Sequence, residues 1–369
     1  AIGFQSLFSN TASNNTAVGY CALRSNTTGT ENTSLGLCSM RLNTTGRYNT
    51  SVGSKSSANN TTGCANVSLG QGALYLNIVG NNNTAIGRSS LTYNTASNNT
   101  AVGFCALKSN TTGTQNEAVG FRAMKSNTTG FDNIAMGSYA LHSNISGCAN
   151  VALGTETLGS NTAGNNNIAI GRNALLLNTA SDNTAVGFCA LRYNTTGIKN
   201  TALGFCALAT NTASNNTAVG FCAMVSNTSG CGNTTLGIQA LQYNTIGNDN
   251  TAVGLVALQG NTTGANNTAV GRDALSSNTV GSNNTALGFQ SLLLNTASNN
   301  TAVGFCALRS NTTATNNTGI GYGALRTNTT GDHNTALGKV ALRDNTTGVR
   351  NTAVGSAALM LNTVGSYNT

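Results

Sequence analysis

Ten cysteines are the most reactive side chains of this 369-residue chain. Seven of them stand two residues after a recurring glycine: Cys21, Cys38, Cys105, Cys189, Cys206, Cys222 and Cys306. The other three, Cys64, Cys148 and Cys231, follow turn sequences of the type T-T-G or S-G. No two cysteines have the Cys-x-x-Cys spacing of a zinc site, and no histidine cluster accompanies them. We therefore expect neither a metal nor a cofactor.

The spacing of the cysteines also bears on their redox state. Cysteines in neighbouring repeats, such as Cys21 and Cys38, would point in parallel, a geometry that disfavours the dihedral angle of a disulfide. We expect the first seven cysteines to be buried free thiols that pack as small apolar residues. The three cysteines in turns are expected to be more exposed and able to crosslink chains in an oxidising environment.

The chain has few groups that could act as a general acid or base. Its two histidines are His142 and His333, and it has nine acidic residues. Asp332 is only a sequence neighbour of His333, and we expect this pair to lie on a solvated turn. The many serine and threonine hydroxyls have no base at a repeating position that would activate them. We therefore expect a protein that is not an enzyme.

These residues belong to a repeat that governs the whole chain. The sequence N-T-A-V-G-x-x-A-L-x-x-N-T-T-G recurs 22 times, and its first glycine returns every 16 or 17 residues. A unit this small cannot enclose a core of its own, so it must bury apolar groups by stacking on its neighbours. Hydrophobic residues make up 39% of the chain and recur in fixed columns, which argues against disorder. Below, this glycine is position 0 of each coil.

The apolar columns predict an all-β fold, a parallel β-solenoid (β-roll) of about 22 coils with two short strands in each coil. Position −1 is aliphatic and position +4 is Leu or Met in nearly every coil, with Ser57 as the exception. Strand alternation then points one set of residues to the core: Val18, Leu23, Leu35, Met40, Cys21 and Cys38. The small residues Ala17 and Ala22 would face outward, either toward water or against another chain.

Two asparagine columns have no exceptions. One lies at position +7 (Asn26, Asn43, Asn60) and the other at position −4 (Asn15, Asn32, Asn49). Asparagine suits turns, and stacked amides can hydrogen-bond from coil to coil. We expect the two columns to form ladders at the two corners of the coil. Gly29 and its equivalents in the T-T-G sequences are expected at positive φ.

A longer period of 84 residues overlies the coils. Five coils are one residue shorter than the others, and they begin blocks that span 1–84, 85–168, 169–201, 202–285 and 286–369. We expect one continuous array over residues 1–369. The last residues would run in phase into the first, which suggests a segment of a longer chain.

Charge is sparse, with a formal net charge of +8 spread over the coils. This is too dilute for nucleic-acid binding, and no apolar run is long enough to span a membrane. Position +5 forms an interrupted basic stripe: Arg24, Arg41, Lys108, Lys125, Arg192, Arg309, Arg326 and Arg343. The stripe would keep the protein soluble, or it would bind anionic polysaccharide or an acidic cell surface.

The segment Asn15–Leu23, N-T-A-V-G-Y-C-A-L, resembles the head repeats of YadA-like trimeric autotransporter adhesins. It is also similar to the N-T-A-I-G-x-x-A-L arrays of surface and tail-fibre-like proteins of bacteria and viruses. The adhesin resemblance implies a left-handed parallel β-roll that assembles as a trimer and serves attachment. The adhesin repeat is shorter, however, and lacks the second N-T-T-G turn, so trimerisation and handedness do not carry over.

Three functions remain open from the sequence. The first is a section of an extracellular or cell-surface filament that associates end to end, and laterally or as a trimer. The second is an adhesin rod or phage-like fibre shaft that presents a tip domain. The third is ice binding through the Thr columns at positions −3 and +8, which Ile78, Glu117, Ile134 and Ile145 interrupt.

Overall fold

The computed structural model describes residues 1–369 as an all-β parallel β-solenoid without helices. The predicted fold class is therefore confirmed. The chain divides into two compact units, Ala1–Asn183 and Thr184–Thr369, and each is described by itself. The prediction of one continuous array in five blocks stays a prediction.

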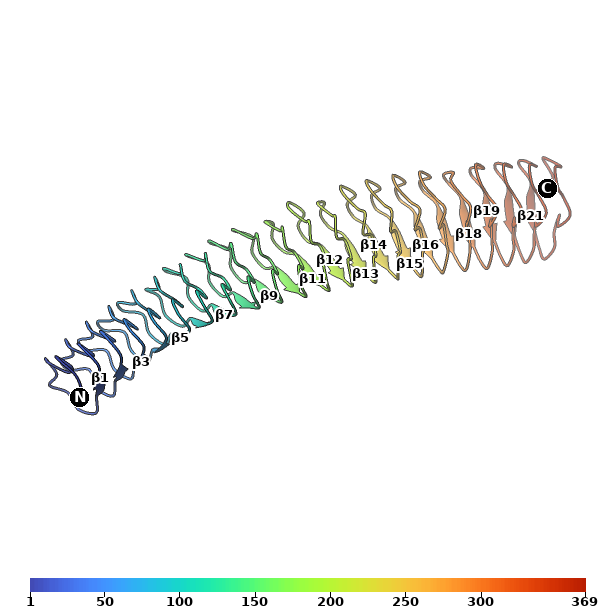
Figure 1. The fold of residues 1–369 in the computed structure, drawn as a ribbon. Coiled ribbons are helices and arrows are strands. Elements are labelled where there is room, and N and C mark those ends of the chain that lie inside the picture. The colour runs from blue at the N-terminus through green and yellow to red at the C-terminus, as the bar shows by residue number, and fades with distance from the viewer. The chain divides into compact units, whose positions relative to one another are not determined.

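Each unit contains one parallel sheet of three-residue strands, one from each coil except the first of the chain, where Ile2 forms only a bridge to Val18 (Figure 1). The strands of the first unit are β1 (Thr16–Val18), β2 (Thr33–Leu35), β3 (Thr50–Val52), β4 (Val67–Leu69), β5 (Thr84–Ile86), β6 (Thr100–Val102), β7 (Glu117–Val119), β8 (Ile134–Met136), β9 (Val151–Leu153) and β10 (Ile168–Ile170). Those of the second unit are β11 (Thr184–Val186), β12 (Thr201–Leu203), β13 (Thr217–Val219), β14 (Thr234–Leu236), β15 (Thr251–Val253), β16 (Thr268–Val270), β17 (Thr285–Leu287), β18 (Thr301–Val303), β19 (Thr318–Ile320), β20 (Thr335–Leu337) and β21 (Thr352–Val354). Within a unit, each strand pairs with the next in exact coil register, as Thr16 does with Thr33.

The prediction of a second strand in each coil is wrong. Residues +1 to +6 form consecutive turns, because positions +2 and +4 have positive φ, as in Cys21 (53°) and Leu23 (49°). Their amides nevertheless bond to neighbouring coils: Cys21 N–H donates to Phe4 C=O (2.9 Å) and Leu23 N–H to Ser39 C=O (3.1 Å). This segment, which we call the turn wall, is therefore bonded to the coils on both sides without being extended.

The core lies between the strand and the turn wall, and its composition corrects the predicted alternation. Leu23, Met40 and Cys21 are buried, but so are Ala17 and Ala22, which were expected to face outward. By contrast, Val18, Leu35 and Cys38 are only partly buried, so assigning them to the core was wrong.

The serine-containing coils show why small residues occupy the core. Ser51 at position −2 and Ser56 at position +3 lie on opposite walls of one coil, and their hydroxyls are 2.8 Å apart. Because the walls are this close, positions −2 and +3 hold small residues, Ala or Ser in all coils except at Thr157, Thr235 and Gly319. The long side chain at position +4 fills the remaining width. Ser57 takes that +4 position in one coil and bonds to Ser68 Oγ (2.8 Å), which extends the buried hydroxyl network.

Both asparagine columns form the expected ladders. Asn43 Nδ2 donates to Asn26 Oδ1 (2.7 Å) and Asn60 Nδ2 to Asn43 Oδ1 (2.8 Å). Asn32 Nδ2 donates to Asn15 Oδ1 (3.2 Å) and Asn49 Nδ2 to Asn32 Oδ1 (3.1 Å). Most of these amides find their partners within the protein, so they can be buried at low cost. Asn278 Oδ1 and Asn317 Nδ2 are the exceptions, since neither atom has a hydrogen-bond partner.

The two ladders do not lie at two separate corners, as had been expected. They flank a single loop, because one glycine carbonyl accepts bonds from both columns. Gly46 O accepts from Asn43 Nδ2 (3.0 Å) and from Asn32 Nδ2 (2.8 Å). The opposite end of the coil is the turn at the position 0 glycine.

The glycines of the T-T-G sequences are required for space rather than for positive φ. Gly29 does not have a positive φ; that conformation falls instead on the residue before the −4 asparagine, such as Glu31 (59°). A Cβ on Gly29 would lie 2.6 Å from Asn26 Oδ1 and would also meet the carbonyl of Gly46. The prediction of positive φ at Gly29 was therefore wrong.

Candidate functional surfaces

All ten cysteines are free thiols. Among the seven at position +2, four are buried (Cys21, Cys105, Cys189 and Cys306) and three are partly exposed (Cys38, Cys206 and Cys222). Position +2 lies at the surface, since Lys55 and Glu156 are exposed there, and side chains of neighbouring coils cover a cysteine at this position. Of the three turn cysteines, Cys231 is exposed, whereas Cys64 and Cys148 are half-buried.

Cysteine alkylation by iodoacetamide should therefore discriminate strongly between these sites. Burial raises the pKa of the Cys306 thiol, and nearby Arg309 and Arg326 only partly oppose this effect. Because the thiolate is the reactive form, we expect Cys231 to react on the order of tenfold faster than Cys306 at neutral pH. Peptide mass spectrometry over a time course measures both rates. Equal rates in the folded protein would contradict the burial order.

No group of three or more His, Cys, Asp or Glu side chains lies where it could hold a metal ion. The structure has no helix with the length and apolar character required to cross a membrane. The candidate surfaces are instead columns of equivalent side chains that follow the coils.

The first surface, which we call the glycine-edge strip, consists of positions −1 and +1 on either side of the glycine turn. Position −1 is apolar in every coil, whereas position +1 is Phe, Tyr, Leu or Ile in 13 coils and polar in the other nine, Gln71 and Arg88 among them. The apolar members have substantial exposure, as in Leu203 (39%), Phe205 (46%), Leu236 (52%) and Ile238 (52%). In the first unit, Tyr20, Leu37, Val119 and Phe121 are exposed in the same way. Partly or fully exposed apolar side chains at position −1 of every coil, joined by runs of apolar residues at position +1, are unusual on a soluble surface and indicate an interaction site.

Aromatic rings at position +1 stack from coil to coil within the strip. Phe205 stacks with Phe188 (ring centroids 5.1 Å apart) and with Phe221 (5.3 Å). Phe305 stacks in the same way with Phe289 and Tyr322, both at 5.2 Å. The glycine-edge strip was missed in the sequence, where position −1 was assigned to the core. The recurrence of Phe and Tyr directly after the glycine was the available signal.

The second surface carries the predicted basic stripe. Seven of its members are partly buried and Arg326 is exposed, and all eight occupy position +5 of the turn wall: Arg24, Arg41, Lys108, Lys125, Arg192, Arg309, Arg326 and Arg343. The stripe is interrupted in both units. Arg309 Nε donates to Gln290 Oε1 (3.0 Å), and Arg343 forms an ion pair with Asp344 (2.8 Å).

His142 also stands at position +5, beside basic neighbours. Burial lowers the pKa of its imidazole, and the positive charges of Lys125 and Arg122 lower it further. The ring lies 5.3 Å from that of Tyr139. His142 is therefore a neutral member of a positively charged face at neutral pH.

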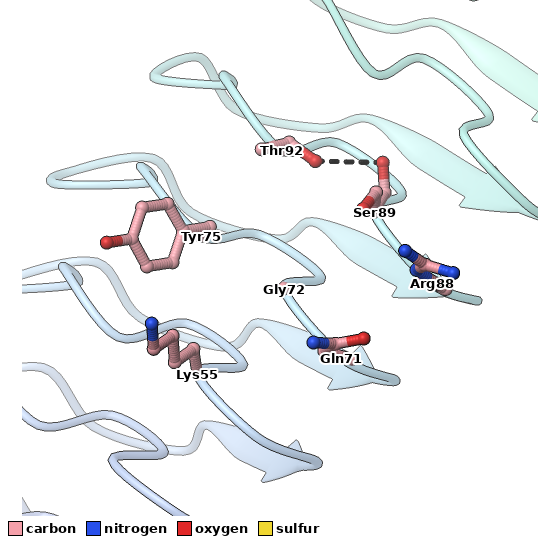
Figure 2. A pocket seen from close by; sticks show the side chains of 7 residues that line it. All are labelled: Lys55, Gln71, Gly72, Tyr75, Arg88, Ser89 and Thr92. Carbon is pink, nitrogen blue, oxygen red and sulfur yellow. Dashed lines mark hydrogen bonds between the residues drawn. The ribbon is translucent and has the colours of Figure 1, made fainter.

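The turn wall of the first unit also has a hollow, which could not be predicted from the basic residues at position +5 alone. It has a volume of about 230 Å³ and is lined by Lys55, Gln71, Gly72, Tyr75, Arg88, Ser89 and Thr92 (Figure 2). These residues come from positions +1, +2 and +5 of three successive coils. Considering position +5 by itself missed Lys55 and Arg88. A signal was present in the sequence, since no acidic residue occurs between Glu31 and Glu117.

The threonine columns differ in their hydrogen bonding. At position +8 the hydroxyls bond to the next coil, as Thr27 Oγ1 does to Thr44 C=O (3.0 Å) and Thr44 Oγ1 to Thr61 C=O (3.1 Å). At position −3 the threonines begin the strands, and they are uninterrupted from β11 to β21. Ice binding stays a prediction, and the −3 column of the second unit is the surface that would carry it.

A scan against protein-family models and a search among curated proteins found no match for this chain. The likeness to adhesin head repeats therefore rests on the short motif alone.

Proposed function

We propose that this chain is a non-enzymatic structural protein, a section of an extracellular or cell-surface β-solenoid fibre in which copies pack side by side. The observation that carries the proposal is the glycine-edge strip. Its apolar side chains are about half exposed to solvent, as Leu203 and Leu236 show at position −1 and Phe205 and Ile238 at position +1. Covering one such half-exposed side chain would contribute roughly 1 kcal/mol, and the gain would accumulate coil by coil.

The strip favours a second copy of the same chain over other partners because of its period. All coils stack at about 4.8 Å per strand, so a second copy presents its own strip with the same spacing. Contacts made by position −1 at one coil are then repeated at every coil along the contact. A globular partner could match only a few coils. Self-association through the strip also explains why apolar residues stand where solvent would otherwise favour polar ones.

The columns that face away from the strip support a mainly structural role. Buried ladders at Asn43 and Asn60 join coil to coil without interruption by a ligand site. The thin core is filled by small residues on the two walls and by Leu or Met at position +4. An adhesin rod or phage-like fibre shaft would use the same assembly, with attachment carried by another domain. End-to-end association stays a prediction.

Charge placed on the strip should dissociate the assembly. The variant Val186→Lys/Leu203→Lys/Val219→Lys changes position −1 in three adjacent strands, and lysine cannot be buried there without a partner. Its matched control, Thr184→Lys/Thr201→Lys/Thr217→Lys, changes position −3 of the same strands, where Glu117 shows that a charge is accepted. We expect the wild type and the control to form multimers and the first variant to be monomeric in sedimentation velocity.

Electron micrographs and fibre diffraction of the same samples complete the test. The wild type should give elongated particles with a reflection near 4.8 Å along the long axis. A wild-type protein that stays monomeric up to its solubility limit would refute lateral assembly. So would equal dissociation of the two lysine variants, because the effect would then not depend on the strip.

A further inference from the structure

We propose that the hollow between Lys55, Tyr75 and Arg88 is a binding site for an anionic polysaccharide that carries carboxylate or sulfate groups. Figure 2 shows Gly72 between the side chains of Tyr75 and Gln71, with Lys55 on the preceding coil and Arg88 on the following one. Gln71 and Arg88 stand at position +1, beside the apolar residues of the glycine-edge strip, but anion binding in the hollow needs no second copy of the chain, so this inference does not rest on the proposed fibre.

The hollow exists because one coil has glycine at position +2. Gly72 has a φ of 66°, and a Cβ added to it would meet nothing closer than Ser89 Oγ at 4.0 Å. The flanking coils have Lys55 (φ 57°) and Ser89 (φ 58°) at the same position, so the backbone does not require glycine there. The glycine therefore opens space rather than relieving strain.

The charged groups around this space are available to a ligand. The chain has two ion pairs, Arg272 with Asp273 and Arg343 with Asp344, and both lie in the second unit. Lys55 therefore has no acidic partner, and the Arg88 guanidinium is held only over the ring of Phe104, 5.8 Å from its centroid. With no acidic residue between Glu31 and Glu117, the local potential is positive and attracts anions.

The spacing of the cations favours a polymer over a single anion. Lys55 and Arg88 stand two coils apart, which is roughly 10 Å at about 4.8 Å per coil. At this coil separation the two extended side chains can pair with separate anionic groups of one ligand. A second hollow lined by Cys38, Arg41, Lys55, Ala58 and Tyr75 continues the surface to another cation. A chain with anionic groups at intervals fits this arrangement.

The uncharged groups distinguish a sugar from a nucleic acid. Gln71 and Ser89 offer an amide and a hydroxyl, which suit the hydroxyl groups of a sugar. The Thr92 hydroxyl donates to Ser89 C=O (2.9 Å) and can still accept a hydrogen bond (Figure 2). Tyr75 adds one apolar ring face. Nucleic acid carries a charge about every 1.7 Å of duplex and is bound by clustered cations or by several stacking rings. Three cations and one ring across this length are too few for that role.

Filling the hollow provides the first test. The full chain with Gly72→Gln places a long side chain at position +2, where Gln239 (φ 55°) and Gln290 (φ 53°) already stand in other coils. Gly323→Gln is the matched control, because Gly323 occupies the same position in the second unit at φ 63°. We expect binding to polygalacturonate and dextran sulfate to weaken about tenfold in the first variant and to stay unchanged in the control.

Removing charge provides the second test. Arg88→Gln should weaken binding to both polymers by about tenfold. Arg172→Gln is its control, since Arg172 stands at the same position 84 residues later and outside the hollow. Calorimetry would compare polygalacturonate and dextran sulfate, which separate carboxylate from sulfate recognition, with neutral dextran and single-stranded poly(dT).

The proposal requires binding to at least one anionic polysaccharide, little binding to dextran, and loss in Gly72→Gln and Arg88→Gln alone. Absence of binding to both anionic polymers would overturn it. Losses of affinity in Gly323→Gln and Arg172→Gln as large as those in Gly72→Gln and Arg88→Gln would also overturn it. So would tighter binding to poly(dT) than to the anionic polysaccharides. Circular dichroism of all four variants checks that they fold, so that a loss of binding can be assigned to the altered hollow rather than to unfolding. Sedimentation velocity of the same variants measures any multimerisation defect separately, so failure of this proposal and failure of the proposed fibre are distinguishable.

Discussion

Replacing Gly120 with alanine is expected to lower the free energy of unfolding by about 3 kcal/mol or more. Gly120 is a position 0 glycine with a φ of 138°, a conformation that side-chain-bearing residues rarely adopt. A Cβ at this position would lie 2.5 Å from Gly137 O and 2.7 Å from its carbonyl carbon. The coils would have to separate, which also weakens the bond from Gly120 N–H to Val102 C=O (2.8 Å).

Urea unfolding followed by circular dichroism measures this loss, and Gly72→Ala is the control. Gly72 also has a positive φ, but space is open around it and non-glycine residues take its position in other coils. We expect the control to cost about 1 kcal/mol at most. If the two substitutions were equally tolerated, coil contact at position 0 would not be the constraint that the structure indicates.

Replacing Asn127 with alanine should cost about 3 kcal/mol, because three hydrogen bonds meet at this buried amide. Asn127 Nδ2 donates to Asn110 Oδ1 (2.7 Å) and to Gly130 O (2.9 Å). Its Oδ1 accepts from Asn144 Nδ2 (2.7 Å). Truncation removes these bonds and leaves Asn110 Oδ1 buried without a donor. The same urea titration provides the measurement.

Two further variants separate hydrogen bonding from packing. Asn127→Asp keeps the volume but turns a donor into an acceptor that faces two oxygens, so we expect a loss at least as large. Asn98→Ala is the surface control, since Asn98 is exposed and alanine stands at its position in other coils, as Ala65 does. It should change stability by less than about 1 kcal/mol. An aspartate variant as stable as the wild type would show that the ladder bonds contribute little.

The repeat alone was enough to predict the architecture, because a unit of 16 or 17 residues can bury apolar groups only against its neighbours. The asparagine ladders followed as well, since invariant residues at a fixed period must stack on one another in a parallel solenoid. For the same reason, the basic residues at position +5 could be placed in one column. In each case the inference needs only the coil period.

The direction of each side chain was a different matter. Leu23 and Cys21 adopt positive φ, which their residue types disfavour, so alternation along the turn wall could not be extrapolated from strand geometry. That error reversed the roles of Ala17 and Val18, and with them the identity of the outer surface. The hollow at Gly72 was equally hidden, because it depends on residues from three coils that only stacking brings together.

The sequence by itself therefore determined that this protein is a stacked parallel β-solenoid, and which residues lie in each column. Only the tertiary structure decided which columns face the core, the solvent or a partner. The physical reason is the separation of the two walls. It is small enough for the Ser51 and Ser56 hydroxyls to bond to each other, so alanine and serine fill the interior and the larger aliphatic residues at position −1 are left outside.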